Sequence, residues 1–380
     1  MRHTPSRAAL LAAIAMGTGI GLGCGENRPP SPNLLLITIE DVRPDDLACY
    51  EPTAEQGYAL CNLAQEGGRF VWAFSPSPAT GPAAASLLTG QSALQHGVTE
   101  SAASFLPSSK TTLAERLREG GYATAAFISN PELNRARNLH QGFDVYRDRL
   151  EMDAVAATSR NWMRHVQAPW FVWVHLSAST PERGPTQAPI PESTLLRLDR
   201  GVAELMAALD DGTEAPGILL TSLHGRPDPN STDRPLALAR LRVPLFWRVP
   251  SQSSGPGVGR RIRTPVSLMD VAPTLIAAAG LSTKPTEFEG SPLPYADGPK
   301  RPDRTLMATQ ADSILIIHGA EYASYSDPKQ PESSEVSGRL WPASDPASER
   351  TPRHDAGESA RERSLRLQAW LPDRPSLDEP

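Results

Sequence analysis

Residues 77–90 read Ser-Pro-Ala-Thr-Gly-Pro-Ala-Ala-Ala-Ser-Leu-Leu-Thr-Gly, and they indicate how the surrounding chain folds. A short apolar run at 69–74 precedes this stretch, and alanines and leucines lead up to Gly90. The pattern predicts a strand, a tight turn and a helix. Pro82 fits the first helical position, because its missing N–H would have no partner there. Thr80 would then lie where backbone N–H groups converge, a place that attracts anions.

The hydroxyl of Thr80 has two interpretations. It is a candidate nucleophile that faces a sulfate or phosphate ester bound at the start of the helix. The alternative is an ordinary loop in which the Thr side chain caps the helix. The residues of the turn alone leave both interpretations open.

A second informative stretch is the apolar run at 33–39, which ends in Glu40-Asp41. A continuous apolar run is typical of a central parallel strand buried on both faces. In open α/β sheets, ligands bind at the carboxyl ends of the strands. Two carboxylates at such a position suit a divalent cation with oxygen ligands. The alternative is a solvated strand end.

Length and charge limit the class of protein. The chain has 380 residues, of which 39% are hydrophobic, enough for one large core or a core with a small appendage. The formal net charge of -6 argues against a nucleic-acid partner held through phosphate contacts. We therefore expect a globular protein that does not bind nucleic acid.

The first 24 residues are typical of an export signal. Arg2 and Arg7 precede an apolar, small-residue run at 8–22, and Gly23-Cys24 follows it. The run is shorter than the roughly 20 residues of a transmembrane helix. It is similar to a bacterial lipoprotein signal with Cys24 as the lipidated residue. We expect an exported protein, lipid-anchored in the bacterial cell envelope; plain secretion or an uncleaved anchor are the alternatives.

Two further cysteines, Cys49 and Cys61, remain in an exported chain. Exported proteins favour disulfides, and this pair would close a loop of about a dozen residues. Such a bond would stabilise the fold by roughly 3 kcal/mol. Two separate buried thiols are the alternative.

The turn around Thr80 resembles a motif of the sulfatases and their relatives in the alkaline phosphatase superfamily, C/S-x-P-S-R-A-S-L-L-T-G. Pro82 and the run at 85–90 match it, so Thr80 falls at the nucleophile position. Sulfatases modify Cys or Ser there to formylglycine, which Thr cannot form. Thr80 instead resembles the unmodified Thr of phosphoryl- and phosphonyl-transferring relatives. Ala83 and Ala84 replace two polar residues of the motif.

The acidic strand end resembles the sulfatase opening N-V-L-L-I-x-x-D-D-x-R. Asp41 matches its second metal-binding Asp, and Glu40 replaces the first. The family motif S-D-H-G corresponds to Ser222-Leu223-His224-Gly225, so Leu223 replaces a metal-binding Asp. The resemblance implies a divalent cation, Ca²⁺ by analogy, held by Glu40, Asp41 and His224. Because one ligand is lost, a site with no ion is the alternative.

Other polar residues fit the family pattern less well. His96 lies in an H-G-V motif and is expected to be structural, and His175 lies on a predicted buried strand and is expected in the core. The loop at 226–234 lacks the Lys and His with which family members grip the ester oxygens. Arg226 and Arg234 remain candidates for a rebuilt pocket.

The resemblance runs over about 33–371 and implies the fold class. We predict an α/β protein with an alkaline phosphatase-like, mostly parallel central sheet flanked by helices, and a small C-terminal antiparallel sheet plus helix. The expected organisation is a signal peptide at 1–24, a tether at 25–32, a sulfatase-like domain at 33–299, and a small subdomain with a tail at 300–380.

Three hypotheses follow for function. The first is an active hydrolase of sulfuric or phosphoric esters, with Thr80 as nucleophile. The second is a catalytically impaired family member with a binding or scaffold role in the envelope, and the third is a product with no retained role. The packing motifs are kept while the polar site motifs are eroded, which favours loss of activity. The expected ligand is a sulfated or phosphorylated small molecule or glycan.

Overall fold

The computed structural model describes the greater part of the chain from residue 31 onward. The described residues are 31–50, 58–100, 103–167, 169–177, 190–207, 209, 215–227, 236–250, 258–283, 287–295, 304–311, 313–319, 321–326, 334–339, 353–354, 363, 365 and 367. The expected signal peptide, Cys24 and most of the expected tether lie outside them. No described helix is long and apolar enough to cross a membrane.

The described residues form a central sheet of nine strands with β1 in its interior. Only β7 is antiparallel to its neighbours, so the predicted mostly parallel sheet is confirmed. The strand order is β4 (Val145–Arg147), β3 (Ala123–Ile128), β5 (Trp170–Leu176), β1 (Leu34–Ile39), β6 (Gly217–Ser222), β7 (Arg242–Arg248), β2 (Gly68–Phe74) and β8 (Arg260–Ile262), with β9 (Val266–Ser267) beside β2.

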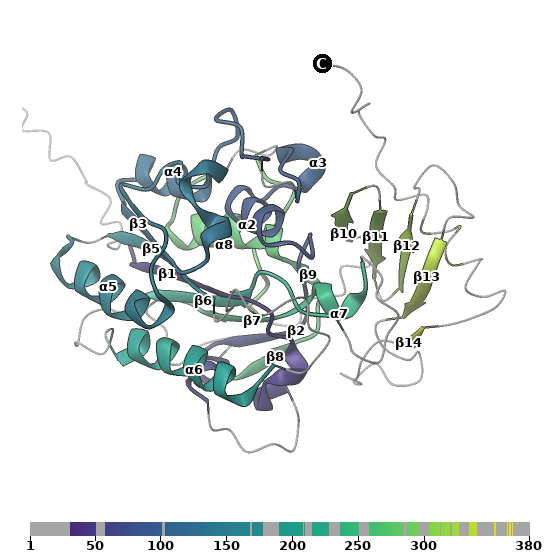
Figure 1. The fold of residues 1–380 in the computed structure, drawn as a ribbon, viewed down its shortest axis with the longest axis horizontal. Helices are drawn as coiled ribbons and strands as arrows, with labels where there is room; N and C mark the ends of the chain where they lie inside the picture. Colours follow the sequence, from purple (N-terminus) through teal and green to yellow (C-terminus); the bar gives the residue numbers. More distant parts are fainter. Residues whose placement is uncertain are drawn as a thin grey trace, which may run out of the picture. The chain divides into compact units, whose positions relative to one another are not determined.

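Helices cover both faces of this sheet (Figure 1). Leu34 and Leu36 of β1 pack toward one face and Leu35 and Ile37 toward the other, so the apolar run serves two cores. The first face carries α2 (Thr80–Thr89), α3 (Ala93–His96), α4 (Leu113–Glu119) and α8 (Val271–Ala278), and the second carries α1 (Ala59–Glu66), α5 (Met152–His165) and α6 (Glu192–Ala207).

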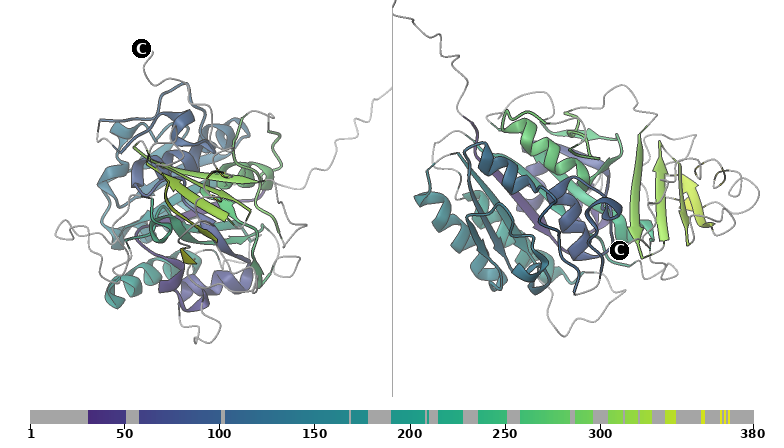
Figure 2. Two further views of the ribbon diagram at one scale, coloured as in Figure 1. Left: turned by 90° about the vertical axis from the view of Figure 1, so that its right-hand side faces the viewer. Right: turned by 90° about the horizontal axis from the view of Figure 1, so that it is seen from above.

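A second, antiparallel sheet of five strands follows the main one in the chain (Figure 2). One of its faces packs Leu315 and Ile317 against Trp72 of β2 and Leu241 of the short helix α7 (Leu238–Leu241). Leu367, which is helical, covers the other face. The strands are β10 (Thr305–Gln310), β11 (Ser313–His318), β12 (Glu321–Tyr325), β13 (Ser334–Arg339) and β14 (Arg353–His354). Both sheets belong to one compact unit, Ser31–Pro380.

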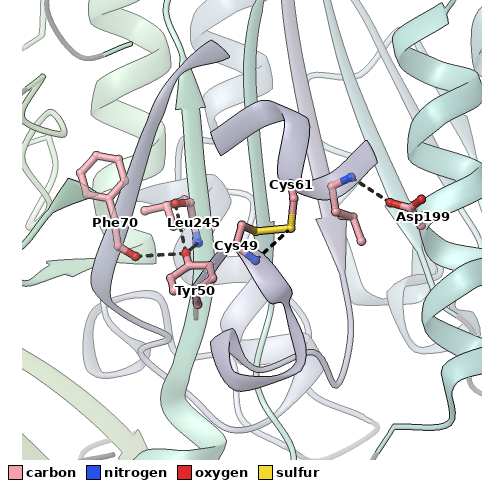
Figure 3. The surroundings of a disulfide bond; sticks show 7 residues. Cys49, Tyr50, Cys61, Phe70, Asp199 and Leu245 are labelled. Carbon is pink, nitrogen blue, oxygen red and sulfur yellow. Dashed lines mark hydrogen bonds between the residues drawn. A yellow bond between two sulfur atoms is a disulfide. The ribbon is translucent and has the colours of Figure 1, made fainter. Parts of the chain in front are cut away.

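The junction of β2 and β7 contains an irregularity that a side chain fills. The register shifts between Phe70 and Ala73. At Phe70 the hydroxyl of Tyr50 donates to the Phe70 carbonyl oxygen at 3.1 Å and accepts from the Leu245 amide at 2.9 Å (Figure 3). Phe70 and Leu245 are register partners, so the tyrosine oxygen stands between two paired strands.

The turn before α2 differs from its prediction in one respect. The helix begins at Thr80, with Ala79 as N-cap, and the Ala83 amide already donates to the Ala79 carbonyl. Pro82 is therefore the third helical residue rather than the first. It is tolerated there because first-turn amides have no intrahelical acceptor. Gly90 ends the helix in the left-handed conformation, as its sequence position predicts.

Candidate functional site

The ends of several strands and the start of α2 bring a set of polar side chains together. Glu40 follows β1, Asn130 lies just beyond β3, His175 is near the end of β5, and His224 follows β6. These strands are parallel neighbours, so their carboxyl ends meet at one edge of the sheet. Thr80, at the start of α2, completes the set.

Glu40 is the centre of this cluster. Its side chain is buried, and Asn130 Nδ2 lies 2.7 Å from each of its two carboxylate oxygens. Thr80 Oγ1 donates to Oε1 at 2.8 Å. His175 Nε2 lies 3.6 Å from the same oxygen. Side chains of this protein therefore surround the carboxylate with donors.

The surroundings of Glu40 keep it ionised. Burial alone would raise the pKa of Glu40, but interaction with His175, the charge of His224 and a hydrogen bond from Ser177 lower it to about 2. Glu40 thus carries a negative charge over the whole physiological range.

His175 is held by a chain of hydrogen bonds. Trp173 Nε1 donates to Thr38 Oγ1 at 2.9 Å, and Thr38 Oγ1 lies 2.8 Å from His175 Nδ1. Because the indole N–H can only donate, the Thr38 hydroxyl proton is free to go to Nδ1. This tautomer puts a hydrogen on Nε2, which is buried without a hydrogen-bond partner and faces Glu40. The expectation that His175 lies in the core is correct for its burial, but its ring belongs to the site.

Thr80 also contacts His224. Its Oγ1 lies 3.1 Å from Nε2, and Nδ1 lies 3.0 Å from the Gly225 carbonyl oxygen and 3.6 Å from Asp41 Oδ1. A carbonyl oxygen only accepts, so Nδ1 carries a hydrogen. The single hydrogen of the Thr80 hydroxyl goes to Glu40 and not to Nε2. Thr80 is 7% exposed and the His224 side chain 13% exposed. A carboxylate, a hydroxyl and an imidazole therefore lie in a row near the surface.

The three residues predicted as metal ligands do not converge on one point. Glu40 approaches His224 from the Nε2 side, through Thr80, whereas Asp41 lies at Nδ1 on the other side of the ring. Leu223, at the position of the expected fourth ligand, is fully buried in the apolar core. Among the described residues, no three His, Cys, Asp or Glu side chains are placed to hold an ion. The arrangement does not fit a divalent cation.

The residues considered for a rebuilt pocket take other roles. Arg226 pairs with Asp46 through both terminal nitrogens, at 2.5 Å each, and donates to the Asp41 carbonyl oxygen. Ala83 and Ala84 are buried in the apolar core. Arg234 lies outside the described residues. The Arg226 side chain thus stabilises the loop that follows Glu40 through these hydrogen bonds.

His96 forms a second hydroxyl–imidazole pair on the same helix. Its Nδ1 accepts from the Val98 amide at 3.0 Å, which leaves the hydrogen on Nε2, 2.9 Å from Ser86 Oγ. Ser86 and His96 are both fully buried. Desolvation and the charge of Lys110 lower the pKa of His96 to about 3. Its structural role agrees with the expectation from sequence.

Cys49 and Cys61 form a disulfide, with a Cα–Cα distance of 5.5 Å (Figure 3). Cys61 belongs to α1 and Cys49 to the short 3₁₀ helix Ala48–Tyr50. The Leu60 amide beside it donates to Asp199 of α6 at 2.8 Å. The bond ties the loop that carries Asp41 and Asp46 to the second face of the sheet.

Sequence reasoning missed two members of the cluster, Asn130 and His175. Asn130 follows the parallel strand β3 just as Glu40 follows β1, which is the signal that could have found it. His175 gave no such signal, because a histidine within an apolar strand more often packs in a core. Its role depends on the register that sets β5 beside β1, with Thr38 opposite His175.

The fold places the chain in a class of proteins. Many solved structures match this fold, and two of them serve as examples. A protein solved with its substrate D-glucosamine-2-N,6-O-disulfate matches with a TM-score of 0.69 and 14% identity, over 83% of this chain and 92% of that one. A phosphonate monoester hydrolase of Agrobacterium radiobacter matches with a TM-score of 0.65 and 17% identity, over 84% and 91%. The chain has the alkaline phosphatase-superfamily fold.

The sequence then gives the family. The model of the Sulfatase family matches residues 32–179. Arylsulfatase G of Rattus norvegicus is 37% identical over 129 residues, which cover 32% of this chain and 24% of that protein. Residues 32–179 therefore resemble the sulfatase family, and these comparisons support a sulfatase-family member. The matched region spans about a quarter of the length of this relative. Sulfatases typically use a divalent cation, which makes the arrangement around Glu40 unusual.

Proposed function

We propose that this sulfatase-family protein has lost the metal-dependent hydrolysis of its family and acts as a binding or scaffold protein of the bacterial cell envelope. Its ligand would be a sulfated or phosphorylated glycan or small molecule. One observation carries this proposal: Glu40, at the position of a metal ligand, is surrounded by Thr80, Asn130 and His175.

The loss of hydrolysis follows from what an ester hydrolase of this kind needs. A divalent ion activates the nucleophile and takes up charge from the leaving oxygen. Here the carboxylate faces hydrogen-bond donors, and an alkyl group, Leu223, stands where the family has a carboxylate. Losing one charge-stabilising group typically lowers the rate 10²–10³-fold, and this chain has lost several.

The ligand class and the location have separate support. A structural neighbour was solved with a disulfated glucosamine as its substrate, and this chain keeps the helix start at which its family binds ester groups. The Cys49–Cys61 disulfide suits an oxidising compartment outside the cytoplasm. The lipoprotein-like sequence that ends at Cys24 supports anchoring to a membrane.

Calorimetric titration tests the binding role. The purified chain is titrated with D-glucosamine-2-N,6-O-disulfate and with unsulfated glucosamine, both in the presence of EDTA. The proposal expects measurable affinity for the sulfated sugar only. Equal affinity for the two sugars, or none for either, would contradict it.

One observation favours a second candidate, the active sulfuric- or phosphoric-ester hydrolase with Thr80 as nucleophile. The Thr80 hydroxyl is 3.1 Å from His224 Nε2, as a nucleophile and base would be. This candidate expects turnover of aryl sulfate or aryl phosphate that rises with added Ca²⁺. It further expects that turnover to vanish in Thr80→Ala and Asp41→Ala. Turnover that passes both tests would replace the binding proposal.

A further inference from the structure

The edge of the central sheet opposite the Thr80 cluster carries an apolar pocket. This edge is formed by the first residues of β1, β6, β2 and β8 and by the last residues of the antiparallel β7. The pocket is open to solvent, and none of its lining residues belongs to the Thr80 cluster. Most of the lining is apolar and includes Phe70, Trp247, Val249, Ile262, Pro294 and Tyr295.

Two aromatic side chains distinguish this pocket from an ordinary surface depression. Trp247 is 2% exposed, and its indole N–H has no hydrogen-bond partner among the described residues. Tyr295 is 48% exposed, although it is a large apolar side chain. Rings with an apolar body and a polar tip are typical of the boundary between a membrane and water.

Positive charge lies beside the pocket. The strand β8, which forms one wall, contributes Arg260 and Arg261, and Arg263 follows it. Arg260 is exposed, whereas the other two are half-buried and interact with other groups of the chain. The acidic residue of the lining, Glu66, pairs with Arg248 at 2.6 Å. A cationic rim around an apolar surface attracts anionic lipid headgroups.

The chain enters the sheet at this same edge. The Gly217 amide donates to the Asn33 carbonyl oxygen at 2.9 Å, and the Trp170 amide donates to Asn33 Oδ1 at 3.0 Å. From β1 to β8 there are four strand spacings, about 20 Å in all. Residues 25–32 connect Asn33 to Cys24, and a chain of this length spans at most about 30 Å. A lipid on Cys24 would therefore hold this edge close to the membrane.

We propose that this edge of the sheet docks on the bilayer in which Cys24 anchors the chain. The partner is a lipid surface with anionic headgroups: Tyr295 lies among the headgroups, and Arg260 faces their phosphates. This inference rests on the membrane anchor of the proposed function and adds the orientation of the protein on the membrane.

The orientation has a consequence for the Thr80 cluster. Thr80 follows β2 at the opposite edge of the sheet, and the seven residues of β2 place it about 20 Å farther from the lipid. Docking at the pocket thus turns the cluster away from the membrane. A sulfated or phosphorylated ligand reaches it from the aqueous side.

Spin-label depth measurements on the full chain test the docking. The chain is incorporated into vesicles of phosphatidylglycerol and phosphatidylcholine, and a nitroxide is attached to Tyr295→Cys or, as a control, to Phe105→Cys. Cys49 and Cys61 are joined and buried, and mass spectrometry confirms a single label. We expect the label at position 295 to collide with oxygen dissolved in the bilayer. The label at position 105 is expected to collide with a water-soluble nickel complex.

Phe105 is a matched control because it is an exposed aromatic residue near the other edge. It is 57% exposed. The carbonyl oxygen of the adjacent Ser104 accepts from Arg137 at 3.2 Å. The Arg137 guanidinium in turn lies against Gly81 at the start of α2, where a Cβ atom would be 3.1 Å from its central carbon. The two labels therefore report on opposite edges of the sheet.

A matched charge reversal tests the contribution of Arg260. Arg260 begins β8 and Arg147 ends β4, both are exposed, and these are the two end strands of the sheet. Because β4 is parallel to β3, Arg147 lies at the carboxyl edge. Arg260→Glu is expected to lower the oxygen-to-nickel collision ratio at position 295 several-fold, since it places a negative charge against an anionic surface. Arg147→Glu is expected to leave this ratio unchanged.

Three results would overturn the inference. The first is a label at position 295 that stays accessible to the nickel complex in a chain that sediments with the vesicles. The second is an equal effect of Arg260→Glu and Arg147→Glu. The third is a chain that does not sediment with vesicles, which would contradict the anchor as well. Titration with the sulfated sugar is independent of these results, because Tyr295→Ser is expected to leave that affinity unchanged.

Discussion

Helix α2 carries two hydroxyl–imidazole pairs of nearly equal length in different surroundings. Thr80 and His224 are 3.1 Å apart at its first residue, and Ser86 and His96 are 2.9 Å apart in its interior. The first pair is partly exposed and has a carboxylate on each side. The second is sealed in the apolar core, where burial lowers the pKa of His96 to about 3.

The comparison shows that distance alone does not define the role of a hydroxyl–imidazole pair. His96 Nδ1 accepts from a backbone amide, so its Nε2 carries the proton and cannot take one from Ser86. His224 Nδ1 faces a carbonyl oxygen instead, and its Nε2 lies beside a hydroxyl that donates to Glu40. The two rings thus differ in the backbone partner of Nδ1, which is an amide donor for His96 and a carbonyl acceptor for His224.

The largest expected difference between the pairs is in stability. His96→Ala leaves the Ser86 hydroxyl and the Val98 amide without partners and opens a cavity, so we expect a loss of about 3–5 kcal/mol in the free energy of unfolding. His224→Ala removes a partly exposed ring and is expected to cost less than about 1 kcal/mol. Urea titration of both variants measures the difference, and equal losses would contradict the assigned roles.

The disulfide is expected to make the next-largest contribution to the free energy of unfolding. It lies against the second face of the sheet, away from Ser86 and His96 on the first. Replacing Cys49 and Cys61 together with alanine is expected to lower the free energy of unfolding by about 3 kcal/mol. The contribution of His96 is expected to stay the same in this background, because the two sites share no partner. A double-mutant cycle with His96→Ala checks this independence.

The depressed pKa of His96 makes the fold sensitive to acid. The unfolded chain binds a proton on His96 below about pH 6.5, whereas the folded chain does so only near pH 3. Stability is therefore full above pH 6.5 and falls as the pH decreases toward 3. Between pH 7 and pH 5 we expect a loss of about 2 kcal/mol from this residue.

Urea titrations of the parent chain and of His96→Gln, at pH 7 and at pH 5, test whether the acid sensitivity comes from His96. The variant is expected to lose about 2 kcal/mol less than the parent over this interval. An unchanged pH dependence in the variant would assign the acid sensitivity to other groups. Glu40 adds a separate loss at lower pH, between about 4.5 and 2.

The smallest expected effect is that of metal ions. Because neither pair on α2 is organised around a cation, EDTA, Ca²⁺, Mg²⁺, Mn²⁺ and Zn²⁺ are expected to leave the melting temperature unchanged. A specific ion at 100 times its dissociation constant would stabilise the folded chain by about 2.7 kcal/mol. A melting shift that disappears in Asp41→Ala would show that a metal site survives.

Much of the fold was predictable because its signals are local. Residues 34–37 are apolar at every position, which is typical of a strand buried on both faces. Thr112 and Glu115 form the capping box that their spacing predicts at the start of α4. The placement of Pro82 was wrong, because helix starts depend on backbone hydrogen bonds that composition does not show.

The sequence predicted which residues form the site better than it predicted how they are arranged. Thr80, Glu40, Asp41 and His224 do lie near one another, since parallel strands end at a common edge. The family motif suggested one shared ion. What separates Asp41 from Glu40 is the backbone between them, where Asp41 adopts a left-handed conformation with φ of 59°. That turn directs the two carboxylates to opposite sides of His224, and no residue spacing reveals it.

The tyrosine oxygen between β2 and β7 has a consequence for hydrogen exchange. The Leu245 amide donates to a side chain instead of to the neighbouring strand, so its protection depends on residue 50. The residue next to Tyr50 is the disulfide cysteine Cys49, which fixes where that oxygen stands. Exchange of one amide in the interior of the sheet thus reports on a loop far from it in sequence. A phenylalanine at position 50 would leave the Leu245 amide and the Phe70 carbonyl without this bridge, in a region where water does not reach.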